Sequence, residues 1–125
     1  MLREIETDYG TISFDKNLIT EMIYDAVEMF DGKVWLGNPG NRFQLRNNDD
    51  RSYMDIRFEE EKLLVDIEVI VSFGTSINAV THDILSYIRL RIVEAFGEID
   101  TRLKITVTGV QTNQQIARRN IEVEL

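Results

Sequence analysis

Acidic side chains at alternate positions are the first residues whose spacing could support chemistry. Asp66 and Glu68 lie two positions apart in LLVDIEVIVSF. On a strand they would share one face at a separation of about 7 Å. With Asp55 opposite, they could bind a hard cation or act as an acid/base pair. Arg57 shares that face, however, and pairing of opposite charges between neighbouring strands explains the same residues. We therefore expect cross-strand ion pairs, with a cation site as the alternative.

His82 is the only histidine of the chain. Helical periodicity places it on the solvent side of its helix, about 140° from the apolar stripe. A catalytic histidine needs a nucleophile or a carboxylate held beside it, and Asp83, next in sequence, faces another direction. We expect a solvated surface histidine and no catalytic residue.

The turn Gly74-Thr75-Ser76 separates a predicted strand from a predicted helix. Free amide groups at a helix N-terminus bind anions, so this turn could cradle a ligand. Phosphate loops follow the patterns GxxxxGK[ST] or GxGxxG, and neither pattern is present. Glycine also permits a sharp exit from a strand, and Ser76 or Asn78 can cap the helix. We favour a structural joint and expect no cofactor.

The string Gly37-Asn38-Pro39-Gly40 matches the GXXG loop with which KH domains clamp an RNA backbone. Its flanks resemble strands, and Pro39 is typical of a turn. The net charge is −8 and the pI is near 4.6, which disfavours nucleic acid and bare anionic membrane as partners. A KH-like RNA-binding domain is therefore the alternative function, and we expect no nucleic-acid partner.

The elements that position these residues follow from hydrophobic periodicity. We predict a strand over 11–14, a helix over 18–30, a further strand at 43–45, a hairpin of 53–58 and 63–72, a helix over 77–96 and a strand over 103–110. The order is β-α-β-β-β-α-β. Two amphipathic helices on one face of a mostly antiparallel sheet would bury both apolar stripes, which predicts a two-layer α+β fold. The length of 125 residues fits a single domain over residues 1–125, with 112–125 as a C-terminal tail.

Both helices show a core stripe and recognisable ends. The predicted stripes are Leu18, Ile19, Met22, Ile23, Ala26, Val27 and Phe30 in the first helix, and Ile77, Val80, Ile84, Ile88, Ile92 and Ala95 in the second. Tyr24 falls on the polar side of the first helix. Asp15 can cap that helix, Asp31-Gly32 can end it, and Gly97 can end the second helix.

Several apolar residues are not needed for the predicted core. Leu90 and Val93 fall on the face of the second helix away from its stripe, and Trp35 lies near a loop. Ile121 and Val123 alternate in the tail, which could add a strand to its own sheet or to a neighbouring chain. Trp35 could anchor a partner or close one end of the core. We take these five as candidate interface residues and expect a protein partner and self-association.

Composition limits the cellular setting. The chain has no cysteine, so it has no disulfide framework or thiolate metal site, as suits a reducing cytoplasm. No apolar run approaches the roughly 20 residues that span a bilayer, and the start MLREIETDYG lacks the apolar region of a signal peptide. We expect a cytoplasmic protein that does not insert into a membrane and could lie on one only through a partner.

Four segments carry a resemblance to a known family: GTISFDKNLITEMI, VDIEVIVSFGTSI, IRLRIVEAFGEI and KITVTGV. Over residues 9 to 111 the chain resembles the alkaline shock protein family, the Gls-type envelope stress response proteins. The matching pattern positions are Gly10, Ile12, Phe14, Phe73, Gly74, Ile77, Gly109 and Val110. Where many members have a short E-x-x-G-V segment, this chain has the longer MFDGKVWLGNPGNRFQL, and its RRNIEVEL matches nothing in the pattern.

The resemblance implies a function as well as a fold. It implies a non-enzymatic cytoplasmic interaction or scaffold protein linked to cell-envelope stress or homeostasis. It also implies recruitment to the membrane by a separate anchor protein, which is then the expected partner.

Overall fold

A computed structural model describes residues 2–7, 10–39 and 53–125 of the chain. The elements in chain order are β1 (Leu2–Thr7), β2 (Gly10–Asp15), α1 (Lys16–Glu28), β3 (Val34–Leu36), β4 (Met54–Glu59), β5 (Lys62–Ser72), α2 (Ile77–Phe96), β6 (Asp100–Gln111) and β7 (Ile116–Glu124). The predicted strand at 43–45 lies outside the described residues.

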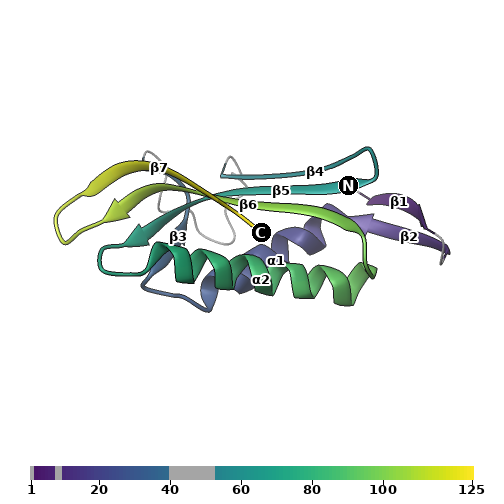
Figure 1. The fold of residues 1–125 in the computed structure, drawn as a ribbon, viewed down its shortest axis with the longest axis horizontal. Helices are drawn as coiled ribbons and strands as arrows, with labels where there is room; N and C mark the ends of the chain where they lie inside the picture. The colour runs from purple at the N-terminus through teal and green to yellow at the C-terminus, as the bar shows by residue number, and fades with distance from the viewer. Residues whose placement is uncertain (1, 8–9, 40–52) are drawn as a thin grey trace.

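A five-stranded sheet forms one layer and the two helices form the other (Figure 1). The sheet order is β3-β5-β6-β7, and β4 pairs with the same strand β5. Only β5 and β6 are parallel among these pairs; the other three pairs are antiparallel. Strands β1 and β2 form a separate antiparallel hairpin. The predicted α+β fold, with both helices on one face of a mostly antiparallel sheet, is confirmed.

Helix α1 begins at Lys16, two residues before the predicted range and directly after the predicted cap Asp15, whose carboxylate accepts a hydrogen bond from the Asn17 backbone amide at 2.9 Å. It ends at Glu28, earlier than predicted, and Gly32 follows in a turn with a φ of 84°. The prediction for Tyr24 was wrong. Its side chain is only 5% exposed, and its hydroxyl lies 2.8 Å from the hydroxyl of the buried Tyr53. Tyr53 immediately precedes β4, so α1 is covered on a second side that its own periodicity does not reveal.

Helix α2 packs on the sheet through Val80, Ile84, Ile88 and Ile92, as predicted. Ala95 was assigned to this stripe wrongly, since it is exposed and Phe96 is buried instead. The buried side chains recur every four residues, and this spacing rotates the stripe by about 40° at each step. The rotation carries the stripe towards Phe96 and away from Ala95.

The centre of the core comes from alternate residues of β5 and β6. The inward-facing side chains are buried: Leu63, Val65, Ile67, Val69 and Val71 on β5, and Leu103, Ile105 and Val107 on β6. The turn that leads into β5 is made by Glu60 and Glu61, both in the left-handed region with φ of 51° and 63°. This turn allows β4 to pair with β5 from Glu59 opposite Lys62 onward.

Strands β3 and β4 share one edge of β5, and Glu68 lies where they meet. The Gly37 amide donates to the Glu68 carbonyl at 2.9 Å, and the Glu68 amide donates to the Tyr53 carbonyl at 2.7 Å. Strand β3 is the strand-like flank before Gly37; it is missing from the predicted element order because three residues are too few to show a period of two.

The C-terminal tail adds a strand to its own sheet, one of the two placements that the sequence allowed. Strand β7 runs antiparallel to β6, with a register shift between Val107 and Gly109. Thr108 lies at this irregularity, and its hydroxyl is within hydrogen-bond distance of the carbonyls of Gly37 (3.2 Å) and Val69 (3.1 Å). The Thr108 hydroxyl therefore connects β6 to β5 and to the residue that follows β3.

Candidate functional site

The acidic residues of β4 and β5 lie on the face of the sheet that the helices leave uncovered. Asp55 is directly opposite Asp66 in the register. Asp66 Oδ2 lies 3.4 Å from Lys104 Nζ on β6, and the same ammonium group lies 3.7 Å from Glu122 Oε1 on β7. Arg57 Nε lies 3.0 Å from Asp55 Oδ2. Asp66 therefore forms an ion pair across neighbouring strands, as the sequence favoured, but with Lys104. Arg57 instead pairs with Asp55 on its own strand β4.

The carboxylates of this face act electrostatically on Lys104. The pKa of the Lys104 ammonium is raised above its ordinary value. The largest cause is the charge of Asp66; the hydrogen bond to Asp66 and the charge of Glu122 act in the same direction and contribute less. Asp66 Oδ1 is buried and has no hydrogen-bond partner within the described part of the chain. Over residues 2–7, 10–39 and 53–125, no group of three or more His, Asp or Glu side chains is arranged to hold a metal ion.

His82 is exposed on α2, on the solvent side where the sequence placed it. Asp83 is exposed as well. Neither side chain is held in the core, so the structure does not bring the histidine into the carboxylate network of the opposite sheet face.

Each residue of the Gly74-Thr75-Ser76 turn has a place in the joint between β5 and α2. Gly74 has a φ of 89°, which favours glycine. The Thr75 amide donates to the Ser72 carbonyl at 3.1 Å, and the Ser76 hydroxyl accepts from the Ala79 amide at 3.3 Å. The interpretation that the sequence favoured, a structural joint with a helix cap, accounts for the role of all three residues.

The described part of the GXXG-like string follows a strand. Gly37 comes directly after β3, its amide donates to Glu68 and its carbonyl accepts from the Thr108 hydroxyl. The Asn38 side-chain amide lies 3.4 Å from Glu68 Oε1. Gly40 lies outside the described residues. A KH loop needs helices on both sides and free backbone groups, whereas Gly37 uses both of its groups to connect β3, β5 and β6.

The five candidate interface residues fall on three separate parts of the molecule. Leu90 and Val93 lie on the outer surface of α2 and are 58% and 40% exposed. Ile121 and Val123 lie opposite Val107 and Ile105, so they occupy the helix-facing side of the edge strand β7, where Ile121 is exposed and Val123 packs against the core. Trp35 lies in β3, at the other edge of the sheet, where it pairs with Ile70 and is half-buried.

Other exposed apolar side chains were not among the candidates. Leu18, assigned to the core stripe of α1, is exposed, and so is Met29. Phe73 has the largest exposed fraction of these large apolar side chains, at 75%. Phe73 is an aromatic residue directly before the glycine that follows a strand, and this position is the signal that could have identified it, because such a residue lies at the very end of the sheet.

Neither helix of the described residues is long and apolar enough to cross a membrane.

Comparison with known proteins identifies the family. The model of the alkaline shock protein family, described as having a "cell envelope-related function", matches residues 4–112. A Bacillus subtilis (strain 168) protein named "Uncharacterized protein YloU" is 26% identical over 113 residues, which cover 86% of this chain and 94% of that protein. No solved structure matches the chain significantly. The resemblance is thus confirmed: the chain belongs to the alkaline shock protein family, which has a cell envelope-related function.

Proposed function

We propose that this chain is a non-enzymatic interaction protein of cell-envelope homeostasis, and that the outer surface of α2 binds a partner protein at the membrane. The family assignment supports the envelope link. The observation that carries the proposal is the exposure of Leu90 and Val93 on the helix face opposite the core. We call the surface around these two residues the α2 outer surface.

The neighbours of Leu90 and Val93 resemble the rim of a protein interface. Arg91 and Glu94 stand next to them, with Arg91 Nε 3.8 Å from Glu94 Oε1. The Arg91 guanidinium also donates a hydrogen bond to the Tyr87 hydroxyl at 2.8 Å and lies 5.7 Å from the centre of that ring. An apolar centre bordered by charged and aromatic side chains is the usual anatomy of a protein-binding patch.

The size of the apolar contribution can be estimated. Full burial of a leucine or valine side chain contributes about 1.5–3 kcal/mol. Since Leu90 and Val93 are 58% and 40% exposed, their burial by a partner contributes about 1.5–3 kcal/mol in total. The net charge of −8 favours a partner with an apolar face bordered by basic side chains. This is the chemistry that we propose for the partner, with a membrane-anchor protein as the candidate.

The test compares two variants that add the same charge to α2. Leu90→Asp/Val93→Asp removes the apolar pair, whereas Asn78→Asp/His82→Asp adds two carboxylates at exposed polar positions of the same helix. Circular dichroism verifies that both variants fold. The measurement is cross-linked capture from the native host together with cell fractionation.

We expect the unaltered chain and the control variant in the envelope fraction with the same captured protein. The Leu90→Asp/Val93→Asp variant should lose at least about tenfold of that capture, since 1.4 kcal/mol corresponds to a factor of ten. If both variants remain in the envelope fraction, the α2 outer surface is not the binding site. If Leu90→Asp/Val93→Asp changes the oligomeric state of the chain but not the capture of the partner, the α2 outer surface binds a second copy of the chain instead. Trp35→Ala, made alongside, tests the other edge of the sheet.

A further inference from the structure

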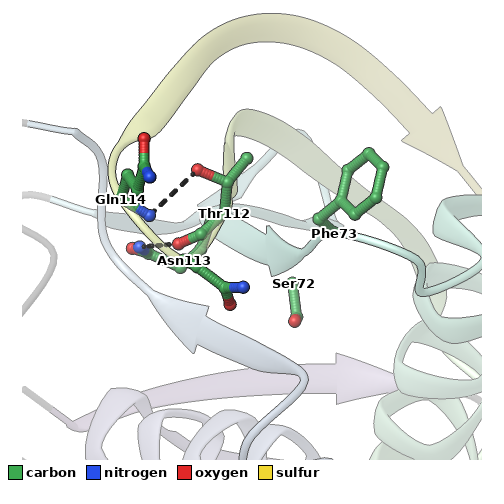
Figure 2. Close-up of a pocket in the computed structure, with 6 residues that line it drawn as sticks. Ser72, Phe73, Thr112, Asn113 and Gln114 are labelled. Atoms are coloured by element: carbon green, nitrogen blue, oxygen red, sulfur yellow. Dashed lines mark hydrogen bonds between the residues drawn. The ribbon is translucent and has the colours of Figure 1, made fainter.

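A pocket at the end of the sheet stands apart from the α2 outer surface. It lies between the end of β5 and the turn that joins β6 to β7, and its volume is about 400 Å³. The lining residues are Ser72, Phe73, Gln111, Thr112, Asn113 and Gln114. Figure 2 shows the Phe73 ring on one side of the opening and the turn with Asn113 and Gln114 on the other. Its volume falls within the range of small-molecule sites.

The turn side of this pocket is held by a dense set of hydrogen bonds. The Thr112 hydroxyl donates to the Gln115 carbonyl at 2.9 Å and accepts from the amides of Gln114 and Gln115 at 3.3 and 3.1 Å. The Thr112 amide also donates to the Gln115 carbonyl at 2.8 Å, and the Gln111 side-chain amide donates to the Thr112 carbonyl at 2.6 Å. These bonds fix the backbone from which Asn113 and Gln114 project, and a fixed backbone lowers the cost of ordering a site.

Phe73 is positioned against the same turn by the backbone. Its amide donates to the Gln111 carbonyl at 2.8 Å, which extends the parallel pairing of β5 and β6 by one residue. Gly74 then turns the chain away with its φ of 89°. The ring remains 75% exposed. A single exposed aromatic side chain is ordinary; here, however, it forms one wall of a pocket whose other wall carries polar side chains.

The chemistry of the lining selects the ligand. None of the six lining residues is ionisable, although 29% of the chain is charged. Asn113 and Gln114 each present a carbonyl acceptor and an NH₂ donor, and Ser72 presents a hydroxyl. Such groups match neighbouring hydroxyls that both donate and accept hydrogen bonds. The Phe73 ring matches a flat C–H face. A sugar ring presents both features on one small, uncharged molecule.

We propose that the pocket beside Phe73 binds an uncharged carbohydrate, with the ring of Phe73 stacked on the sugar and the side-chain amides of Asn113 and Gln114 bonded to its hydroxyls. This site is separate from the partner-binding α2 outer surface, since Leu90 lies in the C-terminal half of α2 and the pocket is lined by residues that precede or follow that helix.

The test is a titration followed by ¹H–¹⁵N NMR on the full chain. The probes are maltotriose, cellotriose and triacetylchitotriose, each at up to about 10 mM, which detects dissociation constants near 1 mM. At least one probe should produce saturable shifts at the side-chain NH₂ groups of Asn113 and Gln114 and at the Gly74 amide. Phe73→Ala should weaken binding by at least about tenfold, whereas Phe73→Tyr, which keeps the ring, should bind within about twofold.

Three results would overturn the proposal. The first is the absence of saturable shifts with all three probes. The second is binding that Phe73→Ala leaves unchanged. The third is a loss of the captured protein partner in Phe73→Ala without saccharide binding to the unaltered chain, which would assign the pocket to a protein. The Leu90→Asp/Val93→Asp variant should bind the saccharide as the unaltered chain does. The proposal of a carbohydrate site and the proposal of a partner surface can therefore be refuted separately.

Discussion

Gly109→Ala offers a sharp test of the way β7 packs on β6. A β-carbon added at Gly109 would lie 2.6 Å from Ile116 Cγ2, 3.3 Å from the Ala117 carbonyl oxygen and 3.4 Å from Pro39 Cγ. The last two contacts need only small adjustments. The first needs a real displacement, because Cγ2 is attached directly to the β-carbon of Ile116 and cannot swing away as the end of a long side chain could.

The expected cost follows from this contact. Overpacking by one methyl group costs about 1–3 kcal/mol, so we expect Gly109→Ala to lower the free energy of unfolding by about 2 kcal/mol and the Tm by about 8 °C. Ile116 is only half-buried, so Ile116→Ala alone should cost about 1 kcal/mol. If the Cγ2 contact is the cause, the double variant should cost about 1 kcal/mol rather than about 3, a coupling of about 2 kcal/mol.

Urea unfolding of the two single variants and the double variant measures this coupling. Ile116→Val is the matched control, because valine keeps the Cγ2 methyl group and should not rescue Gly109→Ala. Additive costs in the Gly109→Ala/Ile116→Ala variant, or an equal rescue by Ile116→Val, would refute the proposed contact and with it the observed register of β7.

Three further predictions concern single contacts. Ser76→Ala should lower the free energy of unfolding by about 1 kcal/mol, measured by urea unfolding, because the Ser76 hydroxyl caps α2; Ser76→Asp should retain stability, and equal losses in both variants would contradict the cap. Asp66→Asn should lower the pKa of Lys104 towards its ordinary value of 10.5, measured by NMR titration, because Asp66 is the main cause of the raised pKa. Since that pKa is raised on folding, the stabilisation by Lys104 is complete below pH 10.5 and is lost as the pH rises through the raised value; an unchanged pKa in Asp66→Asn would contradict this. Tyr53→Phe and Tyr24→Phe should each cost about 1 kcal/mol, and the double variant should cost less than the sum of the two, because both hydroxyls take part in the same hydrogen bond at 2.8 Å; additive losses in urea unfolding would contradict a coupling through this bond.

The regular elements were predictable because each shows its period over many residues. Strand β5 alternates from Lys62 to Val69, and α2 repeats its apolar positions over twenty residues, so pattern alone identifies both. The caps at Asp15 and Ser76 were predictable because the cap residue and the helix start are adjacent in sequence. The alternation of Asp55, Asp66 and Glu68 likewise placed the charged face of the sheet.

The remaining features depend on contacts between distant segments. Tyr24 is buried because Tyr53, 29 positions away, reaches its hydroxyl, and no local period encodes that contact. Ala95 was misplaced because the stripe of α2 follows the sheet beneath it. The pocket beside Phe73 is lined by the end of β5 and by the β6–β7 turn. These two segments are far apart in the sequence, and no sequence pattern indicates that they lie side by side.

The meeting of β3 and β4 at Glu68 has a consequence for the connection between the two strands. Gly37 and Tyr53, which flank the connection between the two strands, are both hydrogen-bonded to the backbone of Glu68. Since both ends are fastened to the same residue, the connection can lengthen or shorten without moving any strand by a single position. A protein engineer could therefore vary the number of residues between Gly37 and Tyr53 while β3 and β4 keep their pairing with β5.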